Sequence, residues 1–368
     1  CLTLLPTAAL AEEAGAAPDA ANADSTYTTG EDAGLAGGED DSAPDDTDGG
    51  EAQDGEADTA VSAVQGASHA SHCVCGKDSS TTVNGHEHDT DTAMAETASL
   101  PSTAGSYYLT QSVSGDWTVP TGEVNLCLNG QTINGKITVG SGATLTLTDC
   151  TDSGRVQGEV TVNGGKLELY SGTITGGVQV GKKGADYQTG SSFTMYGGAI
   201  TGNEDYGGVF LVGTMNHIAP PSFTMHGGTI SNNTAGASDG GGGGVYVGEK
   251  CSFTMDGGAI TDNTATAGNG GGIYIHFNAG NVSISNATIT DNKASATGNT
   301  SYGHGGGIYS ERGVTVKNVT ITGNNSTFEG GGIYGKGAIT LTDATVTDNN
   351  QYDVYYDGAE KTTPELTV

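Results

Sequence analysis

A thirteen-residue unit returns along the chain with the same residue types at the same offsets. It reads SSFTMYGGAITGN at residues 191–203, PSFTMHGGTISNN at 221–233 and CSFTMDGGAITDN at 251–263, so successive copies are thirty residues apart. Near-copies at a fixed period indicate a repeat architecture, in which one supersecondary unit stacks on the next.

Three columns of apolar residues appear when nine successive units are aligned on Met255. The first column contains Leu128, Leu147, Leu169, Met195, Met225, Met255, Ile284, Val316 and Leu341. The second lies two positions earlier and contains Leu126, Leu145, Leu167, Phe193, Phe223, Phe253, Val282, Val314 and Ile339. The third lies five positions later and contains Ile133, Ile174, Ile200, Ile230, Ile260, Ile289, Ile321 and Val346, with Asp152 in the Leu147 unit.

This spacing predicts three short strands in each unit. Residues two apart share one face of a strand, so Phe253 and Met255 point inward together. Gly257-Gly258 supplies a turn before Ile260, and an apolar run such as VYV at 245–247 follows a second glycine cluster. We therefore expect an all-β parallel β-helix solenoid of about nine coils over residues 106–358.

An asparagine follows the third column by three residues in six successive units. These residues are Asn203, Asn233, Asn263, Asn292, Asn324 and Asn349. Asparagine is common in turns, which explains one or two such positions but explains six in register poorly. We expect an inward ladder in which each side chain bonds to its copies, as in other stacked parallel sheets.

The units resemble those of known bacterial surface proteins. The pattern FTMxGGxITxNxA followed by GGGIY is similar to the Gly-Gly-x-Ile and x-x-x-Asn repeats of polymorphic-membrane-protein-like adhesins and of right-handed β-helix (pectin-lyase-like) surface proteins of gut Gram-positive bacteria. NLCLNGQTING at 125–135 and GATLTLTDC at 142–150 resemble N-terminal coils of the second group. The resemblance covers roughly residues 119–358, and it implies a right-handed β-helix with a role in adhesion.

The segments outside the repeats differ sharply in composition. Residues 1–11 resemble the end of a truncated signal peptide, and residues 359–368 read as a truncated C-terminal end. Residues 12–105 carry 21 of the 43 acidic residues and one aromatic, Tyr27, so we expect a disordered acidic linker. The formal net charge of −31 disfavours nucleic acid as a partner. We expect a monomer without membrane insertion that is secreted, extracellular or cell-wall associated.

One part of the acidic linker, residues 69–88, is rich in cysteine and histidine. It contains His69, His72, Cys73, Cys75, His86 and His88. Thiolate and imidazole are the ligands of tetrahedral zinc sites, although Cys-x-Cys is tighter than the usual spacing, and a solvated tail is the alternative. Apart from zinc in this segment we expect no cofactor. Cys127 and Cys150 lie in consecutive units, and the sequence leaves open whether they pair in an oxidising compartment.

An aromatic residue occupies an outward position of the third strand in six units. These residues are Phe210, Tyr246, Tyr274, Tyr309, Tyr334 and Tyr355. A flat aromatic row is a candidate ligand-binding surface for sugar rings; the alternative is a ladder that stabilises the sheet by stacking.

Evidence for catalysis in the sequence is weak. His226 and Asp256 follow the Met column in adjacent units, within reach of proton-transfer chemistry, but any mixed sheet face would show such a pair. Gly303-His304-Gly305 resembles a polygalacturonase motif, yet the rest of that family's pattern is missing. We therefore expect an adhesin-like, non-catalytic protein that presents loops and an aromatic face to glycans or host surface proteins. The alternatives are a polysaccharide lyase or glycoside hydrolase of the pectin-lyase-like class, and a purely structural stalk of a larger surface protein or autotransporter passenger.

Overall fold

Strands make up all of the regular secondary structure in the part of the chain that the computed structural model describes. That part comprises β1 (Val74–Cys75), β2 (Thr81–Val83), β3 (His86–Asp89) and residues 94–358, with gaps at 152, 183–189, 214–218, 237–239 and 297–301. All of these residues belong to the compact unit Gly66–Val368. Within them, no helix of the length and apolarity needed to cross a membrane is found.

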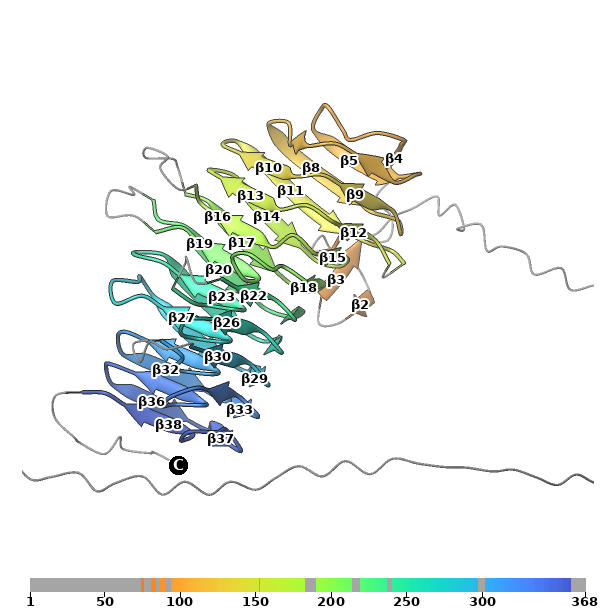
Figure 1. The fold of residues 1–368 in the computed structure, drawn as a ribbon. Helices are drawn as coiled ribbons and strands as arrows, with labels where there is room; N and C mark the ends of the chain where they lie inside the picture. Colours follow the sequence, from red (N-terminus) through yellow and green to blue (C-terminus); the bar gives the residue numbers. More distant parts are fainter. Residues whose placement is uncertain are drawn as a thin grey trace, which may run out of the picture. The chain divides into compact units, whose positions relative to one another are not determined.

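Three long parallel sheets enclose one core. The first sheet contains β4 (Ala95–Thr97), β5 (Gly105–Leu109), β8 (Gly122–Cys127), β11 (Ala143–Thr148), β14 (Lys166–Leu169), β17 (Ser192–Met195), β20 (Ser222–Met225), β24 (Ser252–Asp256), β28 (Val282–Ser285), β32 (Val314–Lys317) and β36 (Ile339–Thr342). The second contains β6 (Val113–Ser114), β9 (Thr132–Asn134), β12 (Arg155–Val156), β15 (Thr173–Ile174), β18 (Ala199–Thr201), β21 (Thr229–Ser231), β25 (Ala259–Thr261), β29 (Thr288–Thr290), β33 (Thr320–Thr322) and β37 (Thr345–Thr347). The third contains β7 (Trp117–Thr118), β10 (Ile137–Gly140), β13 (Val160–Asn163), β16 (Val178–Val180), β19 (Val209–Leu211), β23 (Val245–Val247), β27 (Ile273–Ile275), β31 (Ile308–Ser310), β35 (Ile333–Gly335) and β38 (Val354–Tyr356). The chain visits the sheets in turn, and Figure 1 shows the resulting coils stacked in sequence order from β4 to β38.

Two smaller sheets accompany the three long ones. A fourth parallel sheet of β22 (Thr234–Ala235), β26 (Thr264–Thr266), β30 (Lys293–Ser295) and β34 (Asn325–Ser326) lies between the second and third strands of the later coils. Strands β1, β3 and β2 pair antiparallel in that order. The long coils thus have four strands, whereas the coils before β22 have three.

The core consists of the predicted columns. Phe193, Phe223 and Phe253 are direct register partners, are at most 1% exposed, and stack with ring centroids 4.7 and 5.3 Å apart. Leucine, isoleucine, valine and methionine at the other inward positions join them in one buried cluster. Because the inward residues of β11 and the later strands of the first sheet are register partners of their copies, the all-β parallel β-helix predicted from the sequence is confirmed.

The asparagine ladder is also confirmed. Asn233, Asn263 and Asn292 are fully buried. The Asn233 side-chain amide donates to Asn263 Oδ1 at 2.9 Å, and Asn263 donates to Asn292 Oδ1 at 3.0 Å. Asn292 donates in the same way to Asn324 Oδ1, and Asn324 donates to Asn349 Oδ1. At the other end of the ladder, the backbone N–H of Asn203 donates to Asn233 Oδ1 at 3.1 Å. The ladder therefore satisfies buried polar groups at one corner of six coils.

Three details differ from the sequence-based expectation. The β-helix starts before Ser106, since β4 and β5 extend the first sheet to eleven strands, two more than the nine aligned units. In the first aligned unit Leu126 pairs with Leu147 and not with Leu145. A shift of two residues keeps the same face inward, so the apolar pattern of the sequence does not distinguish the two registers. Val156 occupies the third column between Ile133 and Ile174, the position that the fixed spacing assigned to Asp152.

Candidate functional site

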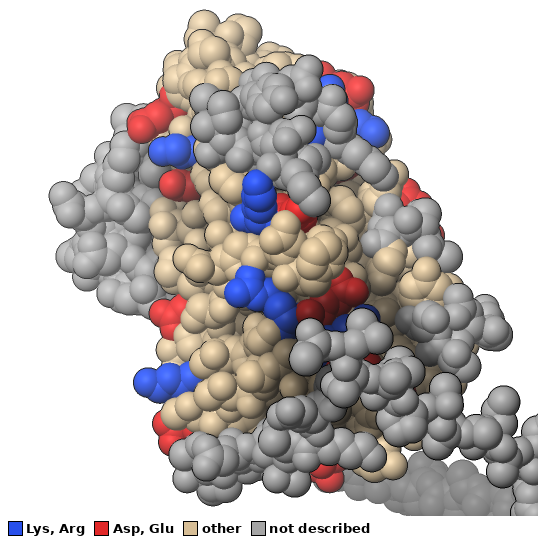
Figure 2. All heavy atoms as spheres, turned by 90° about the vertical axis from the view of Figure 1, so that its left-hand side faces the viewer, with Lys and Arg blue, Asp and Glu red and all other residues tan. Residues whose placement is uncertain are grey.

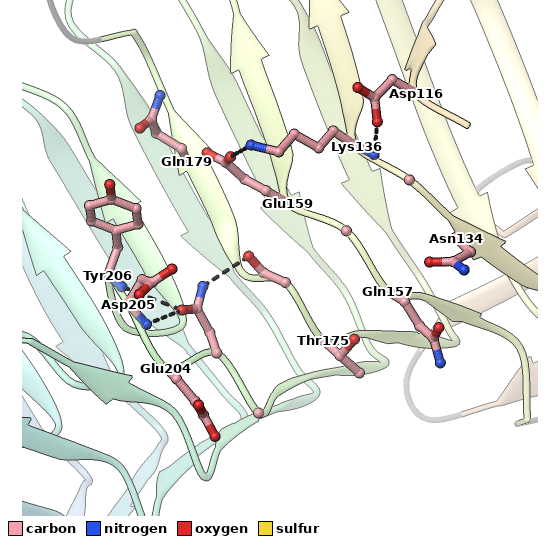
Figure 3. Close-up of a pocket in the computed structure, with 15 residues that line it drawn as sticks. Asp116, Asn134, Lys136, Gln157, Glu159, Thr175, Gln179, Glu204, Asp205 and Tyr206 are labelled. Atoms are coloured by element: carbon pink, nitrogen blue, oxygen red, sulfur yellow. Dashed lines mark hydrogen bonds and ion pairs between the residues drawn. The ribbon is translucent and has the colours of Figure 1, made fainter. Parts of the chain in front are cut away.

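A groove of about 760 Å³ crosses the corner between the second and third sheets in the early coils. Its lining comes from Asp116, Asn134, Gly135, Lys136, Gln157, Gly158, Glu159, Thr175, Gly176, Gln179, Gly202, Asn203, Glu204, Asp205 and Tyr206. This volume lies in the range of ordinary small-ligand sites. Figure 3 shows Asp116 and Asn134 at one end of the groove and Glu204, Asp205 and Tyr206 toward the other.

The floor of the groove is glycine backbone. A Cβ atom on Gly135 would lie 2.1 Å from the carbonyl oxygen of Gly115, and one on Gly158 would lie 2.0 Å from that of Gly135. Only glycine allows this close approach of one turn to the next. The stacked turns therefore leave a shallow surface of peptide groups, without side chains that would fill the corner.

One end of the groove is the point at which the coils become longer. The connection between the second and third strands is short in the coil of Gly176. The next coil inserts residues 203–206 at this point, and the following coil inserts β22. Asn203 fixes this insertion: its Oδ1 accepts the N–H groups of Asp205 and Tyr206 at 2.8 and 3.3 Å, and its Nδ2 donates to Gly176 O at 2.9 Å. The loop thus forms an end wall that is tied to the floor.

One side of the groove carries a preorganised polar row. Lys136 Nζ lies 3.3 Å from Glu159 Oε2, and Thr161 donates to Glu159 Oε1 at 3.3 Å. Asp116 Oδ1 accepts the backbone N–H of Lys136 at 2.9 Å, and the Gln179 side chain donates to Gly181 O at 3.0 Å. Because these groups are already held in place, a ligand would meet fixed donors and acceptors.

The end wall presents exposed groups. Glu204 and Asp205 are exposed, and Tyr206 is 46% exposed with its ring 6.1 Å from that of Phe210. Four carboxylates in the lining face a single lysine, so the groove favours a neutral or cationic ligand over a polyanion. Carboxylates, amides and hydroxyls around one exposed aromatic ring suit a ligand rich in hydroxyl groups.

The predicted aromatic row is a stacked column. The centroid distances are 4.6 Å from Phe210 to Tyr246, 4.9 Å to Tyr274, 5.3 Å to Tyr309, 5.1 Å to Tyr334 and 5.4 Å to Tyr355. Tyr274, Tyr309 and Tyr334 are only 8%, 3% and 5% exposed. Their ring faces are covered by one another, as the stacking alternative describes, and a role of the row in binding sugars stays a prediction.

Polar neighbours close the column from outside. His304 packs on Tyr334 with centroids 4.7 Å apart, and its Nδ1 lies 3.0 Å from Glu329 Oε2. The Tyr334 hydroxyl donates to Asp357 at 2.7 Å. His304, singled out in the sequence for a polygalacturonase-like motif, therefore belongs to the cover of the column.

Charged side chains of both signs are interspersed on the face that Figure 2 shows. Most of its coloured surface is uncharged, and Lys and Arg side chains lie beside Asp and Glu. Elsewhere in the described residues, Lys336 Nζ lies 3.6 Å from Glu311 Oε1 and 5.6 Å from the centroid of the Tyr309 ring.

His226 and Asp256 have separate partners. The His226 ring stacks on Tyr196 with centroids 5.3 Å apart, and Tyr196 stacks on Tyr170 with centroids 4.4 Å apart. Asp256 accepts hydrogen bonds from Asn286 and, at 3.0 Å, from Ser285, and these bonds hold the pKa of its carboxyl below the usual value. No hydrogen bond or ion pair joins the two described side chains, so the geometry gives the pair no proton-transfer contact.

The predicted metal ligands are placed only in part. His69, His72 and Cys73 lie outside the described residues, while Cys75 is in β1 and His86 and His88 are in β3. Among the side chains that are described, no three His, Cys, Asp or Glu residues come together as a metal site. Cys127 Sγ and Cys150 Sγ do meet, at 3.1 Å.

Comparison with protein-family models, with curated proteins and with solved structures gave no match. The resemblance to adhesin and pectin-lyase-like repeats thus stays a prediction. Apart from Asn203 of the asparagine ladder, the groove residues were missed in the sequence because they lie outside the repeated columns. A usable signal was present: the insertion NEDY at 203–206 stands where earlier units have only a glycine turn.

Proposed function

We propose that this β-helix is a secreted or cell-surface, adhesin-like protein that binds neutral glycans in the groove without cleaving them. The observation that carries the proposal is the exposed Tyr206 ring at the end of a polar groove of about 760 Å³. Exposed aromatic rings cover the apolar faces of sugars, while fixed polar groups bind their hydroxyls.

The charges in the groove support a neutral ligand. Asp116, Glu159, Glu204 and Asp205 outnumber Lys136, so a polyuronate would meet repulsion along the site. A surface location rests on the signal-like residues 1–11 and on the acidic composition of residues 12–105. The β-helix then serves as a stiff scaffold for the groove and for the loops between its strands.

The proposal is tested by screening the full chain against a panel of neutral and acidic oligosaccharides. The affinity of each oligosaccharide that binds is then measured by calorimetry. We expect Tyr206→Ala to weaken binding of a neutral ligand about tenfold, which corresponds to about 1.4 kcal/mol. Tyr352→Ala is the matched control, since Tyr352 is 66% exposed outside the groove lining and its loss should leave affinity unchanged.

Two results would contradict this assignment. Equal affinity of the wild-type and Tyr206→Ala proteins would remove the groove as the binding site. Release of new reducing or unsaturated ends during incubation would identify an enzyme of the lyase or hydrolase class instead.

A further inference from the structure

Two thiols of adjacent coils meet on the outer face of the first sheet. Cys127 is the last residue of β8, where it alternates with the inward Leu126 and Leu128. Cys150 follows the end of β11, the strand that pairs with β8 in the next coil. The two Sγ atoms are 3.1 Å apart, and Cys127 is buried whereas Cys150 is exposed. One sulfur is therefore packed inside the protein, while the other is open to reagents in solution.

The turn after β11 brings Cys150 toward Cys127. Cys127 is the register partner of Thr148, so Cys150 lies two positions further along the chain. In a continued strand such diagonal neighbours have Cα atoms roughly 7–8 Å apart, at the upper limit for a disulfide. Because β11 ends at Thr148, Cys150 is not held in that strand geometry, and its sulfur reaches the sulfur of Cys127.

Asp149 holds this turn in place. Its carboxylate accepts the backbone N–H groups of Gly130, at 2.7 Å, and of Gly154, at 2.8 Å. Gly130 belongs to the turn that follows β8, so the first bond ties the turns after β8 and β11 together. The N–H of Asp149 donates to Ser171 Oγ at 2.6 Å, and that hydroxyl donates to Asp149 O at 3.0 Å. The residue next to Cys150 is therefore fixed by bonds to the neighbouring coils.

The surroundings of Cys127 decide which thiol reacts first. Met94 and Tyr108 pack against Cys127, and Tyr108 is also its register partner in β5. The hydrogen bond with Cys150, followed by burial, raises the pKa of the Cys127 thiol. Reactivity of a thiol follows its exposure and its thiolate fraction. The exposed Cys150 is therefore the thiol that meets an external disulfide, and Cys127 is placed to react in the second step.

We propose that Cys127 and Cys150 form a disulfide that closes one coil of the β-helix into a covalent loop. The oxidant is the disulfide of a small thiol or of a thiol–disulfide oxidoreductase. The Cys150 thiolate attacks one sulfur of that disulfide, forms a mixed disulfide and expels the first thiolate. The Cys127 thiolate then attacks Cys150 Sγ and expels the second. The two protein thiols lose two protons and two electrons, and the oxidant is reduced to two thiols.

The cross-link fastens coils near one end of the described stack. The chain between the two cysteines contains β9, β10 and β11, which together make one coil. Closing this loop stabilises the fold by restricting the unfolded chain. The first sheet ends at β4, two strands beyond β8, and end units of such arrays have fewer neighbours to hold them. The surface location proposed above would supply the oxidising environment.

Peptide mapping of the full chain tests the assignment. The protein is produced by secretion into an oxidising compartment, incubated with oxidised glutathione, denatured, alkylated and digested with trypsin. Trypsin cleaves after Lys136, which separates the two cysteines. Cys127 then lies in the peptide 78–136 and Cys150 in the peptide 137–155. We expect a species in which these two peptides are joined, and reduction should convert it into the separate peptides.

Urea unfolding with and without a reductant tests the stabilising role. We expect the reductant to lower the urea midpoint of the wild-type protein by about 1 M. Cys150→Ser, at an exposed position, should unfold at the midpoint of the reduced wild type and should not respond to the reductant. Cys251→Ser is the matched control, because it removes a buried thiol of a distant coil and should keep the response.

Three outcomes would overturn the proposal. The first is the absence of the joined peptides after incubation with oxidised glutathione. The second is a joined species in which Cys127 or Cys150 is paired with another cysteine. The third is one and the same urea midpoint for the oxidised and the reduced wild-type protein. None of these measurements involves a glycan, so their result is independent of the ligand proposed for the groove.

Discussion

At the scale of the residue, the asparagine ladder depends on the residue that precedes each ladder position. Those six residues are Gly202, Asn232, Asp262, Asp291, Gly323 and Asp348, and all of them have φ between 54° and 76°. Glycine, asparagine and aspartate tolerate this left-handed conformation at the lowest cost. The turn that they make aims the following asparagine into the coil, where it bonds to its copies.

Asn263→Ala should be strongly destabilising. The substitution removes Asn263 Nδ2, which donates to Ile230 O and to Asn292 Oδ1. It also removes Asn263 Oδ1, which accepts hydrogen bonds from the backbone N–H and the side-chain amide of Asn233. All of these groups are buried. Unsatisfied buried polar groups cost about 1–3 kcal/mol each, so we expect a loss of about 3 kcal/mol in urea unfolding. Asn325→Ala, at an exposed ladder-adjacent position, should stay within about 0.5 kcal/mol of wild type. Equal effects of the two variants would show that the ladder contributes little.

At the scale of the element, the aromatic column couples stability to alkaline pH. Burial, as the leading cause, raises the pKa values of Tyr274, Tyr309 and Tyr334 above the ordinary value of about 10. A group whose pKa is higher in the folded state contributes its full stability below the unfolded pKa and loses it as the pH rises. The column therefore stabilises the protein below about pH 10 and opposes ionisation above it.

Titration with base should unfold the protein as the buried tyrosines ionise. We expect the tyrosinate absorbance and the loss of far-ultraviolet circular dichroism to rise together above about pH 10. Tyr309→Phe keeps the ring stack and removes one ionisable hydroxyl, so its transition should move to higher pH. Complete, reversible tyrosinate formation with unchanged circular dichroism would show that these hydroxyls are open to solvent.

The strands could be predicted from the sequence because inward residues repeat with a period of two. The same period hides the register in the first aligned unit, where Leu126 and Leu128 are both inward, and the structure is needed to choose Leu147 as the partner of Leu126. The groove could not be predicted from the columns, since Glu159 and Tyr206 face outward in different coils. Their proximity depends on how loops of unequal length stack, which the apolar pattern does not encode.

At the scale of the whole molecule, each coil contacts mainly the coils next to it. Stability in such arrays is close to a sum over coils and their interfaces, so it need not be uniform along the stack. Phe223, Met225 and Ile230 in a central coil are at most 1% exposed, whereas Val346 and Val354 in the last described strands are only half-buried.

Hydrogen exchange should therefore be graded along the chain. Peptides covering β36, β37 and β38 should exchange faster than those covering β20, β21 and β23, because fewer buried contacts oppose local opening there. Mass spectrometry of peptides after timed exchange measures this gradient. Identical protection in both sets of peptides would indicate that the described coils open only together.

The coils of Phe193, Phe223 and Phe253 are close to interchangeable, because Ser-Phe-Thr-Met pairs with Ser-Phe-Thr-Met at each step. Deleting or duplicating one thirty-residue unit would leave every column and the asparagine ladder continuous. Each such event would change the length of the solenoid by one strand spacing, about 4.8 Å. Gain or loss of the unit at 221–250 or of the unit at 251–280 is therefore expected to change the reach of the protein while the groove, whose lining ends at Tyr206, stays intact.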